Sequence, residues 1–202
     1  MKHSNIIPQI SKIIFLLCLV FLHSKSFAID TLKAVDLLSD KQQEETIILK
    51  IKSGQGPVTQ EKIASVVVFL SARCPCSNSH IEELKSLALN YSNIQFIAVH
   101  SNQNESLEEA KIYFKKQNLK FPVLEDKGAL IADEFKAFKT PHAFVVNSQG
   151  QIIYKGGVSS SSHFSDDVKK YLREVLEDVS HGKEPRYTDM RSLGCVILRE
   201  KN

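Results

Sequence analysis

Hydrophobic residues follow two different periods along this chain. Continuous apolar runs at residues 66–70 and 94–99 predict strands that are buried on both faces. The apolar runs 143–147 and 151–155 flank a short turn containing glycine, which predicts a β-hairpin. Elsewhere apolar residues recur every three or four positions, as they do on the inner face of a helix. Segments of this kind are residues 77–91, 105–117, 129–135 and 164–179.

Weaker patterns fill the remaining parts of the chain. Residues 46–52 have strand composition, and residues 121–124 form a short extended piece. We also expect a short helix over residues 34–38 and a helical turn or two over residues 58–63, whereas residues 183–202 have little periodicity. Strands that alternate with helices build a parallel sheet, and a hairpin adds antiparallel edge strands. The sequence therefore predicts an α/β fold with a central mixed β-sheet and helices on both faces.

The first 28 residues have the pattern of a secretory signal peptide. Lysines precede an apolar run at residues 13–22, which is too short to cross a bilayer comfortably. The small-x-small sequence Ser26-Phe27-Ala28 follows and is typical of a cleavage site. We expect cleavage after Ala28, which would leave an exported protein, periplasmic or extracellular, without a membrane span. An uncleaved membrane anchor is the alternative.

Removal of this segment changes the charge balance. The whole chain has 26 Lys+Arg and 23 Asp+Glu, whereas residues 1–28 hold three lysines and no acidic residue. The mature chain then has 23 residues of each sign, so no basic surplus indicates a nucleic-acid partner. Its length is enough for one domain with a hydrophobic core. We assign that domain to residues 29–182 and a C-terminal tail to residues 183–202.

Cysteine usage points to redox chemistry. Cys18 lies in the apolar run and is removed with it, which leaves Cys74, Cys76 and Cys195. Disulfides persist in the oxidising compartments that exported proteins enter. Because three is an odd number, at least one thiol is free, bound to metal or shared in exchange.

Cys74 stands where a buried strand gives way to a helix. Backbone N–H groups and the helix dipole favour a thiolate at such a position, and the neighbouring Arg73 is expected to lower the pKa further. We therefore predict that Cys74 is the nucleophile. Two cysteines are candidates for the resolving thiol that would form a disulfide with Cys74. They are Cys76, which is separated from Cys74 only by Pro75, and Cys195 on the tail. A structural Cys74 and unpaired partner thiols are the alternatives.

Several motifs occur in the order found in a known family. They are Phe69-Leu-Ser-Ala-Arg-Cys-Pro-Cys-Ser77, Phe121-Pro-Val-Leu-Glu-Asp126, Lys139-Thr-Pro-His-Ala-Phe-Val-Val-Asn147 and Ile153-Tyr-Lys-Gly156. Over roughly residues 62–180 the chain resembles the thioredoxin fold, and more closely its redoxin branch, the alkyl hydroperoxide reductase and thiol-specific antioxidant (AhpC/TSA) proteins. The ending Leu193-Gly-Cys-Val-Ile197 is similar to that of some exported redoxin-like proteins. The resemblance implies an oxidoreductase of thioredoxin-like fold, and we expect no cofactor.

The resemblance also assigns roles to single residues. In thioredoxin-like proteins the proline that matches Pro141 is cis and lies opposite the reactive cysteine, so Thr140 and Pro141 are expected to bind substrate. Thioredoxins carry Cys-x-x-Cys, but here Ser77 takes the place of the second cysteine. Peroxiredoxins carry Pro-x-x-x-Thr/Ser-x-x-Cys; Ser71 fits the Thr/Ser place, whereas Val67 replaces the proline. The sequence thus matches neither motif in full.

We expect an exported thiol–disulfide oxidoreductase. Cys74 attacks or donates a disulfide, and Cys76 or Cys195 resolves the mixed disulfide. The partners would be protein thiols or disulfides and an upstream thiol reductant. The alternative is a thiol peroxidase, in which peroxide oxidises Cys74 to a sulfenic acid and Ser71 hydrogen-bonds the peroxide.

A third hypothesis is a copper-binding or copper-delivery module rather than an enzyme. Cys74 and Cys76 would supply thiolates, and His80 or His142 would complete the ligand set, because sulfur and imidazole suit Cu(I). These four residues are only candidates, since a lone histidine is more often a packing or surface residue.

Overall fold

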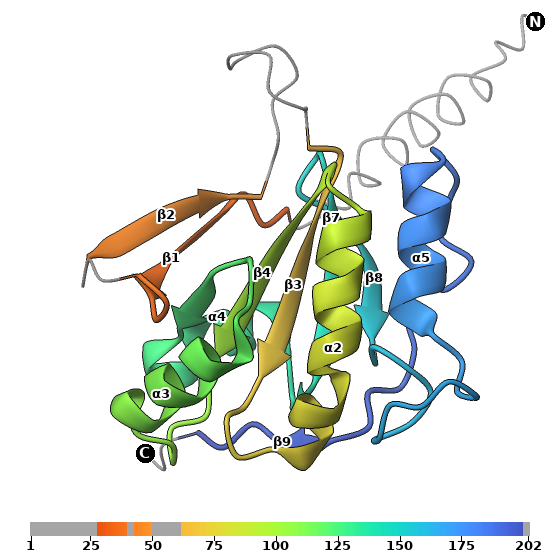
Figure 1. Cartoon of the computed structure of the whole chain (residues 1–202). Coiled ribbons are helices and arrows are strands. Elements are labelled where there is room, and N and C mark those ends of the chain that lie inside the picture. The colour runs from red at the N-terminus through yellow and green to blue at the C-terminus, as the bar shows by residue number, and fades with distance from the viewer. Residues whose placement is uncertain (1–27, 40–42, 50–61, 200–202) are drawn as a thin grey trace, which may run out of the picture.

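A seven-stranded mixed sheet forms the centre of the structure (Figure 1), a computed structural model that describes residues 28–39, 43–49 and 62–199. Its strands are β1 (Thr31–Asp36), β2 (Glu44–Ile48), β3 (Ala64–Leu70), β4 (Ile94–His100), β5 (Val123–Glu125), β7 (His142–Asn147) and β8 (Ile152–Gly156). They lie in the order β2-β1-β5-β4-β3-β7-β8. Strands β3, β4 and β5 are parallel, and the other pairs are antiparallel. The expected α/β fold with a mixed sheet is confirmed.

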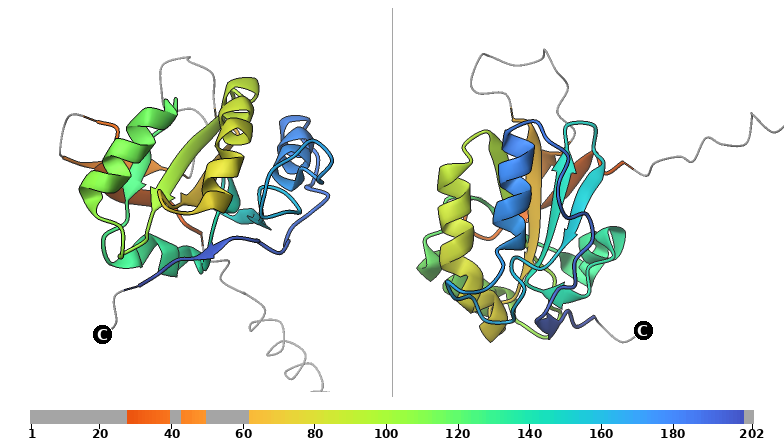
Figure 2. Two further views of the ribbon diagram at one scale, coloured as in Figure 1. Left: turned by 60° about the horizontal axis from the view of Figure 1, so that its bottom comes forward. Right: turned by 90° about the vertical axis from the view of Figure 1, so that its right-hand side faces the viewer.

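Helices cover both faces of this sheet, as Figure 2 shows. They are α2 (Pro75–Asn90), α3 (Leu107–Gln117), α4 (Leu130–Phe135), which follows the 3₁₀ turn η1 (Lys127–Ala129), and α5 (Tyr171–Ser180). Side chains of β3 alternate between two cores, since successive residues of a strand point to opposite faces. Val66 and Val68 pack with α2, α3 and α5, whereas Val67 and Phe69 pack with α4. The continuous apolar run therefore has the expected cause, a strand buried on both faces.

Two expected helices differ from the structure. The helix expected over residues 34–38 is wrong, because this stretch belongs largely to β1, in which Leu32 and Ala34 are buried and Lys33 is exposed with the period of a strand. The last helix begins at Tyr171 rather than at residue 164. Backbone and side-chain hydrogen bonds between Ser160 and Lys169 hold the intervening segment as a loop.

Some expectations fall on residues outside those described. These are the signal peptide, of which residues 1–27 are not described, and the helical turn or two over residues 58–63, of which residues 58–61 are not described. Both stay predictions. Within the described ranges, no helix combines the length and the apolar character needed to span a membrane.

The C-terminal tail forms a strand that the sequence did not predict. Strand β9 (Cys195–Val196) pairs antiparallel with β6 (Lys139–Thr140), and Cys195 lies opposite Thr140. In Figure 1, β9 lies at the end of the molecule where α2 begins. The tail therefore returns to the position where the sequence placed the reactive cysteine.

Candidate active site

Cys74 caps the N-terminus of α2. The preceding residues leave the sheet at the end of β3, and Pro75 occupies the first turn of the helix, where its missing N–H costs nothing. The Ser77 N–H donates a hydrogen bond to the Cys74 Sγ at 3.4 Å. Only 2% of the Cys74 surface is exposed. The sulfur thus lies at the positive end of a helix and is almost completely covered.

The other two cysteines lie next to Cys74. The Cys74 Sγ is 2.6 Å from the Cys195 Sγ, although the two residues are 121 positions apart in the chain. A disulfide bond measures about 2.05 Å, so a small movement separates the free thiols from a covalent link. The sulfurs of Cys74, Cys76 and Cys195 all lie within 4.8 Å of one another. The structure therefore brings together all three cysteines expected at the site.

The surroundings give these thiols very different acidities. Burial alone would raise the pKa of Cys74, but the hydrogen bonds with Cys195 and from the Ser77 N–H outweigh it and lower the pKa to about 7. Burial, together with the hydrogen bond to Cys74 and the charge on it, raises the pKa of Cys195 to about 12. Burial and the charge of Cys74 also raise the pKa of Cys76. Cys74 is consequently the thiolate of the group.

The segment around Pro141 packs closely against both Cys74 and the tail residue Gly194. The Thr140–Pro141 peptide bond is cis, as the resemblance implied. The Thr140 carbonyl oxygen lies 3.0 Å from the Cys74 Sγ. On the other side, Gly194 lies so close that a Cβ atom built on it would be 2.1 Å from the Thr140 oxygen. A glycine is required next to Cys195 for the tail to approach this segment.

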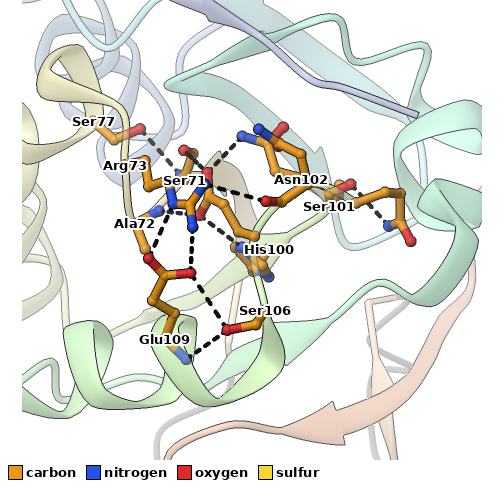
Figure 3. A network of polar contacts seen from close by, with 12 residues as sticks. Ser71, Ala72, Arg73, Ser77, His100, Ser101, Asn102, Ser106 and Glu109 are labelled. Atoms are coloured by element: carbon orange, nitrogen blue, oxygen red, sulfur yellow. Dashed lines mark hydrogen bonds and ion pairs between the residues drawn. The ribbon is translucent and has the colours of Figure 1, made fainter. Parts of the chain in front are cut away.

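A buried carboxylate holds the loop that precedes Cys74, and Figure 3 labels its partners Ser71, Ala72, His100 and Asn102. The Glu105 side chain accepts hydrogen bonds from the Ser71 hydroxyl and from the Ala72 N–H at 2.8 Å. His100 Nε2 lies 3.0 Å from the same carboxylate, and Asn102 Nδ2 donates to it at 2.9 Å. Burial alone would raise the pKa of Glu105, but these hydrogen bonds lower it to about 2. The carboxylate is charged at neutral pH and fixes the loop.

Arg73 and Ser71 have other partners than those expected. The Arg73 guanidinium donates to the Glu109 carboxylate at 2.6 Å (Figure 3) and to the Asn104 carbonyl at 3.3 Å. The Ser71 hydroxyl is engaged by Glu105, and its N–H donates to the Ser77 Oγ at 3.2 Å. Within the described part of the chain, no hydrogen bond joins either side chain to the Cys74 sulfur. The lowered pKa of that thiol comes from other groups.

The two histidines proposed as ligands do not join the sulfur cluster. His80 uses both ring nitrogens, with the Cys76 carbonyl at 2.7 Å and the Ser159 hydroxyl at 2.8 Å. Burial lowers its pKa, so the ring is neutral. The His142 ring packs on Phe144, with centroids 4.5 Å apart, and burial lowers its pKa to about 4. Cys195, rather than a histidine, is the third candidate ligand beside Cys74 and Cys76.

Sequence reasoning missed two parts of this site, the Glu105 network and the tail strand. A signal for the first exists, because the polar run 100–105 begins at the last residue of β4. Functional groups gather at the carboxyl ends of parallel strands in α/β sheets. No corresponding signal marks β9, which is two residues long.

These features define a class of protein: a thioredoxin-like α/β fold with a covered thiol at a helix N-terminus, beside a cis-proline and a second thiol. Comparison with protein families is consistent with this class. Residues 41–155, more than half of the chain, match the AhpC/TSA family. The chain belongs to the AhpC/TSA family.

Solved structures share the fold. An uncharacterized conserved protein from Geobacillus kaustophilus has a TM-score of 0.73 at 19% identity, with 88% of this chain and 93% of that chain covered. A hypothetical protein from Sinorhizobium meliloti has a TM-score of 0.72 at 23% identity, with 88% and 95% covered. A putative thiol:disulfide interchange protein DsbE from Chlorobium tepidum has a TM-score of 0.54 at 11% identity, with 78% and 95% covered. A search of curated protein sequences gave no match.

Proposed function

We propose that this protein is an exported thiol–disulfide oxidoreductase in which Cys74 is the nucleophile and Cys195 is the resolving thiol. The observation that carries the proposal is the 2.6 Å separation of two sulfurs whose pKa values differ strongly. Only the thiolate attacks a disulfide, and a group with a pKa near the ambient pH is an effective attacking thiol. Export is supported by the signal-peptide pattern of residues 1–28.

The two thiols act in sequence. The Cys74 thiolate attacks one sulfur of a substrate disulfide and expels the other sulfur as a thiolate, which leaves a mixed disulfide. Cys195 then loses its proton, attacks the Cys74 sulfur and releases the second substrate sulfur. Two electrons have passed to the substrate, and the protein holds a Cys74–Cys195 disulfide that an upstream thiol reductant reduces. Run backwards, the same steps donate a disulfide.

The mixed disulfide itself activates the resolving thiol. Burial and the neighbouring Cys74 thiolate both raise the pKa of Cys195 in the reduced protein. Once Cys74 is part of a mixed disulfide it no longer carries that charge, so one cause of the raised pKa disappears. Cys195 therefore becomes easier to ionise at the step that needs its thiolate.

Cys76 is the second candidate for the resolving role. Its sulfur belongs to the same cluster, but it lies in the first turn of α2 and would close a small ring around Pro75. Burial and the charge of Cys74 raise its pKa. The geometry favours Cys195, whose strand pairs directly opposite Thr140.

Turnover of a model peptide disulfide with dithiothreitol as reductant tests the assignment in three serine variants. We expect Cys74→Ser to abolish turnover. Cys195→Ser is expected to accumulate the mixed disulfide with the peptide, whereas the matched control Cys76→Ser retains most of the rate. Full activity of Cys74→Ser contradicts the proposed function, and accumulation in Cys76→Ser instead moves the resolving role to Cys76.

The three-sulfur cluster supports a second candidate function, binding of a soft metal ion such as Cu(I). Three thiols within 4.8 Å are a suitable ligand set, since soft thiolates select Cu(I). Anaerobic titration of the reduced protein with Cu(I) against a competing chelator tests it. One tightly held ion that is lost in Cys195→Ser supports the metal site, and no retention of copper excludes it. The peroxidase alternative has less support, because Ser71 and Arg73 bind acidic side chains.

A further inference from the structure

The C-terminal segment 188–198, which we call the strap, fills the strand position beside the cis-proline. Its middle pairs with β6, so that Cys195 faces Thr140. Further hydrogen bonds, three between backbone groups and one to the Asn102 side chain, fasten it on both sides of this point. They are Lys155 N to Thr188 O, Met190 N to Lys155 O, Ile197 N to Phe138 O and Leu198 N to Asn102 Oδ1. An extended peptide can add to β6 only when the strap has moved away, so attack of Cys74 on a peptide disulfide requires that movement.

A pocket beside the strap gives a route to two of the three cysteines. It has a volume of about 340 Å³, and Cys76 and Cys195 line it together with Lys139 and Arg191. Cys74 is not part of its wall and is only 2% exposed, whereas Cys195 is partly exposed. The pocket is far too small for a folded protein, but it has the size of sites for small molecules. A small reactant that enters it meets Cys76 and Cys195, and Cys195 is the more exposed of the two.

Two positively charged residues, Lys139 and Arg191, line the pocket. None of the residues that line it is acidic. Within the described ranges, neither Lys139 nor Arg191 forms an ion pair. Other arginines do have carboxylate partners: Arg73 with Glu109, Arg173 with Glu83, Arg186 with Asp178 and Arg199 with Asp133. Two unpaired cations beside a reactive sulfur favour an anionic reactant.

We infer that the pocket admits a small anionic thiol, which reduces the Cys74–Cys195 disulfide by attacking the Cys195 sulfur. This inference rests on the proposed function and names its upstream reductant by chemical class. The entering thiolate forms a bond to the Cys195 Sγ, and the electron pair of the broken S–S bond leaves with Cys74 as its thiolate. A second molecule of the thiol attacks the sulfur of the first and releases the Cys195 thiol. Two thiols are oxidised to one small disulfide, and one protein disulfide is reduced to two thiols.

The direction of attack follows from the leaving group. Exchange is faster when the sulfur that leaves has the lower pKa. Attack on Cys195 expels Cys74, which the Ser77 N–H and the N-terminus of α2 stabilise as a thiolate. Attack on Cys74 would expel Cys195, which lacks a helix N-terminus, and would also require access to a covered atom. Exposure and leaving-group stability therefore favour the same sulfur.

A series of small thiols of different charge tests the inference on the oxidised full-length protein. The probes are glutathione, which is anionic, 2-mercaptoethanol, which is neutral, and cysteamine, which is cationic. Rates are compared at equal thiolate concentration. We expect glutathione to react about tenfold faster than cysteamine at low salt, since close opposite charges accelerate encounter and salt screens them. Equal rates for all three thiols overturn the inference.

Variants that remove positive charge test whether the preference for the anionic thiol arises from the pocket. In Lys139→Ala/Arg191→Ala the advantage of glutathione over cysteamine is expected to fall to about twofold or less. The control Lys116→Ala/Lys120→Ala removes two exposed positive charges at the end of α3 and keeps the preference. A preference that survives the pocket variant, or disappears equally in the control, contradicts a role for the pocket.

Mapping the mixed disulfide identifies the attacked sulfur. The Cys76→Ser protein is oxidised, exposed briefly to substoichiometric glutathione, quenched with acid and analysed by mass spectrometry. Glutathione on Cys195 agrees with the inference, whereas glutathione on Cys74 contradicts it. If the oxidised protein instead contains no Cys74–Cys195 disulfide, the proposed function itself fails, so the two failures are distinguishable.

Discussion

The two halves of the redox pair are held in very different ways. Cys74 follows a loop that is held by hydrogen bonds to the buried Glu105 carboxylate. It caps the N-terminus of the long helix α2. Cys195 lies on a strap whose strand is two residues long and whose neighbour Val196 is 54% exposed. Backbone hydrogen bonds, a hydrogen bond from the Ser192 hydroxyl to the Pro141 carbonyl and the buried side chain of Ile197, at 2% exposure, hold the strap in place.

The comparison shows how one kind of side chain acquires two roles. Both groups are thiols, yet the environment lowers the pKa of Cys74 to about 7 and raises that of Cys195 to about 12. The fixed half, which is Cys74 with its loop and α2, provides a helix N-terminus for the thiolate. The peripheral half, which is the strap with Cys195, brings a protonated thiol to it. We therefore expect changes in the loop to affect stability and acidity, and changes in the strap to affect the closeness of the two sulfurs.

The variant with the largest expected effect is Gly194→Val, which should displace the strap and slow formation of the Cys74–Cys195 disulfide. A side chain there would collide with the Thr140 carbonyl, since even a Cβ would lie 2.1 Å from its oxygen. Displacement of the strap should slow formation of the Cys74–Cys195 disulfide by about a hundredfold, as small misplacements of reacting groups do. The measurement is the rate of thiol loss with a small disulfide oxidant. The neighbouring control Val196→Ala should react at the normal rate, and an unchanged rate in Gly194→Val would show that the strap is not needed.

Glu105→Gln tests the fixed half. A neutral amide cannot accept all the hydrogen bonds that the carboxylate accepts, so the free energy of unfolding is expected to fall by about 2–3 kcal/mol at pH 7. The pKa of Glu105 is about 2, below that of an unfolded chain at about 4.3, so its contribution is present above pH 5 and is lost as the pH falls toward 2. The difference between variant and wild type should therefore shrink in acid.

Denaturant unfolding at pH 7 and pH 3 provides this measurement. Glu108→Gln, at an exposed position on α3, is the control and should change stability by less than about 0.5 kcal/mol. A difference that does not depend on pH would contradict the assignment of a charged, hydrogen-bonded carboxylate to Glu105.

Cys195→Ala tests how the peripheral half influences the fixed one. It removes the hydrogen bond that helps to lower the pKa of Cys74, so this pKa is expected to rise by about one unit. The thiolate fraction at pH 7 then falls about fivefold. The pH dependence of iodoacetamide labelling, followed for Cys74 by mass spectrometry, gives the value, with Cys76→Ala as control. A midpoint that stays near 7 in Cys195→Ala would mean that the helix alone sets the acidity.

The smallest effect is expected from Arg73→Ala. Its guanidinium is exposed and bound to Glu109 rather than to the sulfur. The labelling midpoint of Cys74 should stay within about 0.3 units of the wild type, because an exposed and neutralised charge is screened. A clear rise of that midpoint would restore the role that the sequence suggested for Arg73.

The fixed half could largely be predicted from the sequence. The apolar run ending at Leu70 marks a strand buried on both faces, and the amphipathic pattern after Ser77 marks a helix, so the two patterns alone place Cys74 at their junction. Both patterns extend over many residues, so they can be recognised in the sequence. The carboxylate that holds the loop was not predictable in this way, because Glu105 meets Ser71 across 34 positions of sequence.

For the peripheral half, the sequence indicated the reactive residue Cys195 but not its position in the fold. The sequence makes Cys195 a candidate because it is one of three cysteines outside the expected signal peptide and lies on the tail beside Gly194. Its position depends on backbone hydrogen bonds to β6, on the space left by Gly194 and on the burial of Ile197. Such contacts leave no hydrophobic period in the tail, since a two-residue strand is too short to show one.

The most direct test is to oxidise the reduced protein with one equivalent of a small disulfide and to map the resulting disulfide bond by mass spectrometry. We predict a single intramolecular bond between Cys74 and Cys195, with Cys76 left free for alkylation. A Cys74–Cys76 bond with Cys195 free would contradict the central claim that the strap carries the resolving thiol.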